Sequence, residues 1–129
     1  MKIKLAGCVI KNSEGKILLI HRNTTKRKQW ELPGGKIEEN EDPKETAKRE
    51  LKEELNIEVE VKNKIGEKDF GEDKFTMKYI WFEGIIKAGE VKLLEDAFDD
   101  YNYFSKQELK EMKKQLSPNV QNLISSQDI

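Results

Sequence analysis

The stretch GKIEENEDPKETAKRELKEELNI, residues 35–57, decides the fold prediction because a glycine turn leads directly into an acidic amphipathic helix. Asp42 is the expected N-cap, Pro43 the first helical residue and Glu45 the third residue after the cap, a pattern that predicts a capping box. An apolar stripe recurs every four residues and consists of Ala47, Leu51 and Leu55. We therefore expect a helix that packs on a β-sheet through this stripe.

Three glutamates on the same helix predict a metal site. At roughly 100° per residue, Glu50, Glu53 and Glu54 fall within an arc of about 100°, so we expect their carboxylates to converge. Like charges at these spacings weaken a helix by a few tenths of a kcal/mol per pair unless a cation lies among them. Hard oxygen ligands favour Mg²⁺, Mn²⁺ or Ca²⁺. The alternative, in a chain with 38% charged residues, is a solvated acidic helix face.

The spacing of Gly35, Glu41 and the run 49–57 resembles the Nudix box, the signature of hydrolases that cleave a nucleoside diphosphate linked to another moiety. Glycine is usual where this chain has Asn56, a residue that also tolerates the left-handed conformation after a helix. The order of flanking elements resembles the family over residues 5–124. The resemblance implies an α/β (α+β) fold, an α-β-α sandwich with a mixed β-sheet between helices.

The resemblance also implies roles for individual residues. The implied metal ligands are Glu50, Glu54 and the backbone carbonyl of Gly34 or Gly35, with Glu53 as a further ligand or the general base. Glu41 is implied to support the site from the loop, and Arg49 to orient the carboxylates. Mg²⁺ is the expected cofactor, with Mn²⁺ as a substitute.

One more acid is expected from the loop before the last strand. Many relatives supply such a carboxylate, and we choose Glu95 over Asp96, Asp99 and Asp100. A solvated loop acid is the alternative. Which of the four completes the site is open at this point.

Arg22 and Asn119 are the expected substrate contacts. Arg22 matches a phosphate-binding position in relatives and is otherwise a strand-end surface charge. Asn119, after Ser117 and Pro118, matches a purine-reading asparagine of the MutT-like branch. Asparagine near a helix start is also common for local reasons.

The MutT-like branch hydrolyses nucleoside triphosphates, including oxidised purine forms such as 8-oxo-dGTP, to monophosphate and pyrophosphate. Residues 17–38 carry this part of the resemblance together with Asn119. Two alternatives remain: hydrolysis of ADP-ribose, ADP-sugars or dinucleoside polyphosphates, and a non-catalytic nucleotide-binding Nudix module.

Length and composition limit the number of domains, the kind of partner and the compartment that we expect. A chain of 129 residues predicts one domain, 1–129. The net charge of −1 favours a small nucleotide over a nucleic acid polymer or a membrane surface as partner. The single cysteine, Cys8, predicts a buried thiol in a reducing compartment. Without an apolar run long enough to span a bilayer, we expect a cytoplasmic protein, either a monomer or a homodimer.

Periodicity and turn residues predict the remaining elements. Strands are expected over 3–10 and 16–21 around a hairpin turn at 12–15, over 57–70 and 75–88, and over 101–104. Helices are expected after a capping box at Ser105 and after Ser117. An aromatic stripe of Phe75, Met77, Tyr79 and Trp81 is expected in the core, with base stacking as the alternative. We expect the cluster of Lys26, Arg27 and Lys28 in a solvated loop, and His21 as a packed or exposed strand residue.

Overall fold

The fold is known from a computed structural model that describes residues 2–127 and 129. Its strands are β1 (Lys2–Ile10), β2 (Ile17–Asn23), β3 (Lys28–Glu31), β4 (Gly34–Lys36), β5 (Glu58–Glu72), β6 (Phe75–Ala88) and β7 (Phe98–Phe104). Its helices are α1 (Pro43–Leu55), α2 (Lys106–Glu111) and α3 (Pro118–Ser126), with a 3-10 turn η1 (Lys113–Gln115). None of the helices in this described part is long and apolar enough to cross a membrane.

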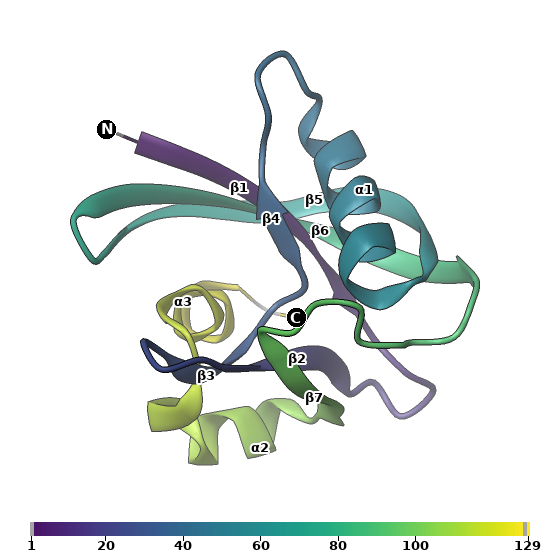
Figure 1. Cartoon of the computed structure of the whole chain (residues 1–129). Coiled ribbons are helices and arrows are strands. Elements are labelled where there is room, and N and C mark those ends of the chain that lie inside the picture. The colour runs from purple at the N-terminus through teal and green to yellow at the C-terminus, as the bar shows by residue number, and fades with distance from the viewer. Residues whose placement is uncertain (1, 128) are drawn as a thin grey trace.

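The strands form two sheets. The larger has the order β4-β1-β6-β5, and it is mixed because β1 runs parallel to β6 and antiparallel to β4. The smaller has the order β3-β2-β7 and is antiparallel. Helix α1 lies on one side of the strands, and α2 and α3 lie on the other (Figure 1). This arrangement confirms the predicted mixed sheet between helices.

Successive side chains of β2 belong alternately to the two apolar clusters of the core. Leu18 and Ile20 pack in the cluster that contains the α1 stripe of Ala47, Leu51 and Leu55. Ile17 and Leu19 pack in the second cluster, with apolar residues of α2 and α3. Because successive side chains of a strand point to opposite faces, one strand supplies both clusters. Helix α1 is thereby held in place by the core.

The predicted hairpin between the first two strands is wrong, although its turn forms. The Asn12 side chain accepts hydrogen bonds from the backbone N–H groups of Glu14 and Lys16. Beyond the bridge between Lys11 and Ile17, β1 pairs within the larger sheet and β2 within the smaller. Both strands contain continuously buried runs. A strand covered on both faces is typical of a sheet centre, where it needs a neighbour on each side.

The other elements follow the prediction closely. Strands β5 and β6 form the expected long antiparallel pair. Strand β7 begins at Phe98, earlier than the expected start at Tyr101. The Asp42 side chain accepts a hydrogen bond from the N–H of Lys44, so α1 has the predicted N-cap but a different donor from the capping-box residue. The capping box at Ser105 is confirmed.

Asn56 and Cys8 have the predicted environments. Asn56 ends α1 in the left-handed conformation, with φ of 61°. Cys8 is fully buried, and burial raises the pKa of its thiol to about 12. A thiol that remains protonated at neutral pH is a poor nucleophile, so the packing role holds.

We predict that Gly7→Ala destabilises the fold. Gly7 pairs with Gly34 across β1 and β4, and an added Cβ would lie under 3.0 Å from both the Pro33 carbonyl oxygen and Tyr79 Oη. Because the Pro33 contact is backbone, the free energy of unfolding should fall by about 1–3 kcal/mol. The control is Gly71→Ala, where an added Cβ meets nothing within 4 Å. Denaturant unfolding should separate the two variants, and equal stabilities would contradict the prediction.

Candidate functional site

Two glutamates of α1 meet the glycine turn at the start of β4. Glu54 accepts a hydrogen bond from the backbone N–H of Gly34 at 3.0 Å, and the residue is only 6% exposed. A Cβ on Gly35 would lie under 3.0 Å from the Glu50 carboxyl group, so this carboxylate packs where a side chain is absent. The turn and the helix therefore bring two carboxylates to one place, one of them buried.

The electrostatics of this pair suit a cation. Burial, followed by the negative charges of Glu50 and Glu95, raises the pKa of Glu54 well above its ordinary value. Burial also raises the pKa of Glu50, although Arg49 opposes the rise. A divalent ion would relieve both the desolvation and the repulsion, and an all-oxygen donor set fits Mg²⁺ or Mn²⁺.

Glu53 lies beside this pair and is held by Arg49. Its side chain is 55% exposed, and its carboxylate lies 3.1 Å from Nη1 of Arg49. Across residues 2–127 and 129, no group of three or more His, Cys, Asp or Glu side chains is gathered closely enough to form a ready-made metal cage. Nη1 of Arg49 donates to both Glu50 and Glu53, so the arginine holds Glu53 next to Glu50 along the helix surface, and convergence of all three α1 carboxylates on an ion stays a prediction.

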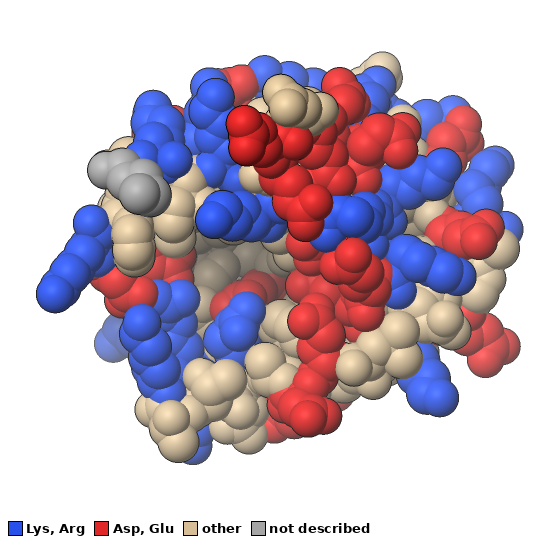
Figure 2. Space-filling view, turned by 45° about the horizontal axis from the view of Figure 1, so that its top comes forward, with Lys and Arg blue, Asp and Glu red and all other residues tan. Residues whose placement is uncertain are grey.

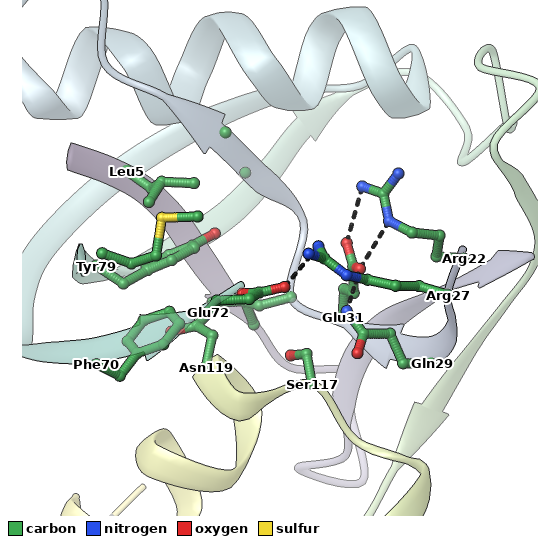
Figure 3. Close-up of a pocket in the computed structure, with 14 residues that line it drawn as sticks. Leu5, Arg22, Arg27, Gln29, Glu31, Phe70, Glu72, Tyr79, Ser117 and Asn119 are labelled. Carbon is green, nitrogen blue, oxygen red and sulfur yellow. Dashed lines mark hydrogen bonds and ion pairs between the residues drawn. The ribbon is translucent and has the colours of Figure 1, made fainter. Parts of the chain in front are cut away.

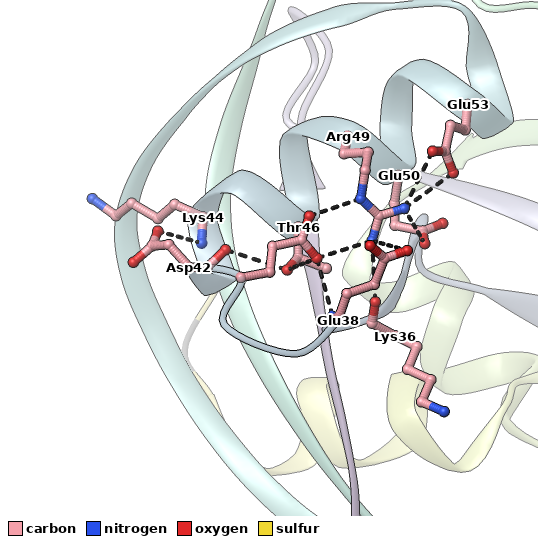
Figure 4. A network of polar contacts seen from close by, with 9 residues as sticks. Lys36, Glu38, Asp42, Lys44, Thr46, Arg49, Glu50 and Glu53 are labelled. Atoms are coloured by element: carbon pink, nitrogen blue, oxygen red, sulfur yellow. Dashed lines mark hydrogen bonds and ion pairs between the residues drawn. The ribbon is translucent and has the colours of Figure 1, made fainter.

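Arg49 connects the loop after β4 to the helix (Figure 4). Its Nε and Nη2 donate to the two Glu41 carboxylate oxygens at 2.8 and 3.0 Å, and Nη1 donates to Glu50 at 3.1 Å. The Arg49 guanidinium and the Thr46 hydroxyl lower the pKa of Glu41 to about 2. Paired charges of this kind fix the orientation of the side chains that carry them. The bidentate pair with Arg49 therefore fixes Glu41 beside the start of α1.

A cavity of about 180 Å³ lies beside the glycine turn (Figure 3). Its apolar wall consists of Leu5, Leu32, Phe70, Met77 and Tyr79. Its polar wall consists of Arg22, Arg27, Gln29, Glu31, Glu72, Ser117 and Asn119. Pockets for complete drug-sized ligands are typically about 300–1,000 Å³, so this cavity suits a group the size of a base. A hollow beside a band of acidic side chains is visible on the surface in Figure 2.

Arg22 lines the cavity but is already paired. Its Nε and Nη2 donate to the Glu31 carboxylate at 2.7 and 3.1 Å, and its guanidinium carbon lies 4.8 Å from the centre of the Phe98 ring. A guanidinium has five N–H donors, so several remain for a phosphate. Glu31 and Phe98 hold the group in place at the cavity.

Among the four candidate loop acids, the surroundings favour Glu95. Its charge acts on Glu54, Glu50 and Arg22. Asp99 instead lies in β7, where it accepts a hydrogen bond from Asn23 and pairs with His21, each at 2.7 Å.

The other two candidates differ in what they contact. Asp100 accepts a hydrogen bond from the N–H of Tyr101 within β7. Asp96 is exposed in the loop beside Glu95. His21 packs against the Trp30 ring, with centroids 4.9 Å apart, as a packed strand residue was expected to do.

Asn119 is buried at the start of α3 and lines the cavity. Its Oδ1 accepts a hydrogen bond from Nε1 of Trp81 at 2.8 Å. An indole N–H is only a donor, so the side-chain amide must present its oxygen to Trp81. The amide NH₂ remains as a donor for a cavity ligand.

Several cavity residues were not predicted. Arg27 was expected in a solvated loop, but it pairs with Glu72 at 2.6 Å and with Asp73 at the tip of the β5–β6 hairpin. Sequence gives no sign of a contact between segments so far apart. A role for Glu31 could have been predicted from the sequence, since a charged residue between Trp30 and Leu32, directly before the glycine turn, indicates a functional position.

The structure is an α+β fold with a carboxylate site where the acidic helix meets the glycine turn. A base-sized cavity lies beside this site. The chain matches the NUDIX domain family over residues 1–125, and it belongs to this family.

Parts of the chain are similar to curated proteins of known name. It is 41% identical over 58 residues to the RNA pyrophosphohydrolase of Bartonella henselae, which is 40% of this chain and 34% of that protein. It is 37% identical over 60 residues to the 8-oxo-dGTP diphosphatase of Proteus vulgaris, which is 45% of this chain and 54% of that protein. The matched parts thus span about a third and about half of the curated relatives.

A similar solved structure covers nearly the whole chain. The crystal structure of the MutT protein from Methanosarcina mazei Go1 has a TM-score of 0.85 and 26% sequence identity. The match covers 96% of this chain and 91% of that one. The arrangement of sheets and helices is therefore similar in the two proteins over nearly the whole chain.

We predict a pH-dependent effect for Glu41→Gln. The pKa of Glu41 is lowered to about 2, so its ionised form contributes stability that is fully present above its ordinary pKa of about 4.3 and is lost as pH falls toward 2. The variant should melt below the wild type at pH 7, and the gap should narrow as pH falls through this window. Thermal unfolding across pH provides the test. Exposed Glu39→Gln is the control, and a gap independent of pH would contradict the prediction.

Proposed function

We propose that this protein is a divalent-metal-dependent pyrophosphohydrolase that cleaves a nucleoside diphosphate linkage. The observation that carries the proposal is the pair of carboxylates, Glu50 and Glu54, packed against the glycine turn beside a base-sized cavity. The proposed ligands of the ion are Glu50, Glu54, Glu53, Glu95 and a backbone carbonyl of Gly34 or Gly35. Mg²⁺ is the proposed ion, and Mn²⁺ the proposed substitute.

The protein groups around this site have separate tasks. A bound divalent ion would neutralise phosphate charge and lower the pKa of a water molecule. Arg49 holds Glu50 and Glu41 in fixed orientations through its hydrogen bonds. Glu53 is paired with Arg49 but its side chain is 55% exposed and so is accessible to water, and we propose it as the general base if it is not a ligand of the ion. Arg22 presents its remaining N–H donors to substrate phosphate.

The proposed substrate is a nucleoside triphosphate, including oxidised purine forms such as 8-oxo-dGTP, cleaved to monophosphate and pyrophosphate. The buried amide of Asn119 supports a base with a carbonyl acceptor, because Trp81 occupies the amide oxygen and leaves the NH₂ donor of a residue that lines the cavity. Glu72 and Glu31 supply acceptors on the same cavity wall. Similarity to the 8-oxo-dGTP diphosphatase of Proteus vulgaris supports the same class of substrate.

A second candidate substrate is a triphosphate at the 5′ end of RNA. The similarity to the RNA pyrophosphohydrolase of Bartonella henselae favours it. The two candidates share the pyrophosphate bond and differ in whether the first nucleotide carries further nucleotides on its 3′ side, so a direct comparison separates them.

A substrate panel tests the proposed function. Purified protein with Mg²⁺ is incubated with nucleoside triphosphates, 8-oxo-dGTP, 5′-triphosphorylated RNA, ADP-ribose and dinucleoside polyphosphates, and released phosphate and pyrophosphate are measured. We expect the highest kcat/KM on a purine nucleoside triphosphate. Preference for ADP-ribose or a dinucleoside polyphosphate would replace the proposed substrate, and absence of turnover on the whole panel would favour a non-catalytic module.

We predict that Glu54→Gln separates activity from folding. The variant should lose at least about 100-fold in kcat, since changes to groups that merely orient metal ligands already cost about 10–100-fold. Its stability should be equal or higher, because an amide avoids burying the raised-pKa carboxyl and its oxygen can still accept from Gly34. Exposed Glu45→Gln on the same helix is the control. Steady-state kinetics with thermal unfolding gives both readouts, and wild-type turnover in Glu54→Gln would refute the ligand assignment.

A further inference from the structure

The hydroxyl of Tyr79 is buried and has no hydrogen-bond partner in the described residues. The residue is 5% exposed. Leaving a buried donor unpaired costs about 1–3 kcal/mol, and a phenylalanine would fill nearly the same space without this cost. Packing in the core, the role expected from the aromatic stripe, accounts for the ring of Tyr79 but not for its oxygen.

Two glycines make room for this oxygen. An added Cβ on Gly7 or on Gly34 would in each case lie under 3.0 Å from Tyr79 Oη. Gly7 and Gly34 face each other where β1 pairs with β4. The hydroxyl therefore lies over the paired Gly7 and Gly34, directly beside the turn that Glu54 contacts.

Tyr79 also has a defined place along the cavity. It lines the cavity together with Asn119, as Figure 3 shows. Gly34 and Gly35 line the same cavity, and Oη of Tyr79 lies against Gly34. The Tyr79 side chain is therefore on the cavity wall that leads to the glycine turn, while Asn119 is a separate polar group of the cavity wall.

In a nucleotide the pentose lies between the base and the phosphates. With its base at Asn119 and its phosphates near Glu50 and Glu54, the pentose occupies the stretch between them. A phenol can both donate a hydrogen bond to a sugar hydroxyl and accept one from it.

We propose that Tyr79 is a specificity-determining residue whose hydroxyl forms a hydrogen bond with a pentose hydroxyl of the nucleotide. The inference rests on the proposed function, because it takes the positions of base and phosphates from it. Because Oη is buried, the proposed contact requires the Tyr79 side chain to move toward the ligand on nucleotide binding.

The test compares wild type with Tyr79→Phe on nucleotides of one base that carry ribose, 2′-deoxyribose or 3′-deoxyribose. For each pair, KM and kcat are measured with Mg²⁺, and binding of the corresponding monophosphate is measured by calorimetry. We expect Tyr79→Phe to raise KM and Kd by about 3- to 10-fold, the size of one hydrogen bond, with kcat unchanged. The loss should vanish for the analogue that lacks the contacted hydroxyl.

Stability and a matched variant complete the design. Tyr79→Phe should unfold at the same or a higher denaturant concentration, because it removes an unpaired buried donor. Met77→Leu, on the same face of β6 and in the same cavity, changes shape but no hydrogen bond, and any effect on KM should be equal for all three sugars.

Three outcomes would overturn the inference. Unchanged KM and Kd in Tyr79→Phe would mean that the hydroxyl meets only internal water. An equal loss with all three sugars would mean that it contacts another part of the nucleotide. If the wild type neither hydrolyses nor binds any of these nucleotides, the proposed function fails as well, and this result is distinct from the first two.

Discussion

The close approach of α1 to the glycine turn is the constraint on which the site depends. Side chains on Gly34 and Gly35 would collide with neighbouring strands or with the Glu50 carboxyl group, so the absence of Cβ atoms lets helix and turn touch. At this contact the Gly34 N–H donates a hydrogen bond to Glu54, which is only 6% exposed. Burying an ionised carboxylate is costly unless it is compensated. The fold thus creates a local demand for positive charge, and we propose that a divalent ion meets it.

Helix α1 carries these carboxylates and also packs in the core. Its apolar stripe lies in the core under the sheets, while Arg49 neutralises the carboxylates that face the loop. The raised pKa of Glu54 and the lowered pKa of Glu41 follow from this division, because one acid is buried among like charges and the other is paired with a guanidinium. Strand β4, which follows directly on Pro33 and begins at Gly34, and strand β6, which lines the cavity, belong to the same sheet, so this sheet connects the glycine turn to the cavity.

Much of this could be predicted from sequence, where the determining interactions are local. The N-cap at Asp42, the apolar stripe and the left-handed Asn56 depend on residues within a few positions, and all are present. Contacts between distant segments were harder. Strands β1 and β2 lie in different sheets because each pairs with strands that are distant in the sequence. The direction of the Glu53 side chain depends on its ion pair with Arg49, which competes with the glycine turn for the carboxylate. Arg27 with Glu72, and the hydroxyl of Tyr79 with its two glycines, depend wholly on the folded arrangement.

A Mn²⁺ titration of isotope-labelled protein, followed by paramagnetic broadening of backbone amide signals, tests most directly whether a cation binds at the glycine turn. We expect saturable broadening that begins at Gly34, Gly35 and the end of α1 around Glu54, and that Mg²⁺ reverses by competition. Broadening that is weak and uniform over the surface, or that is centred on another acidic segment, would contradict the proposed cation site.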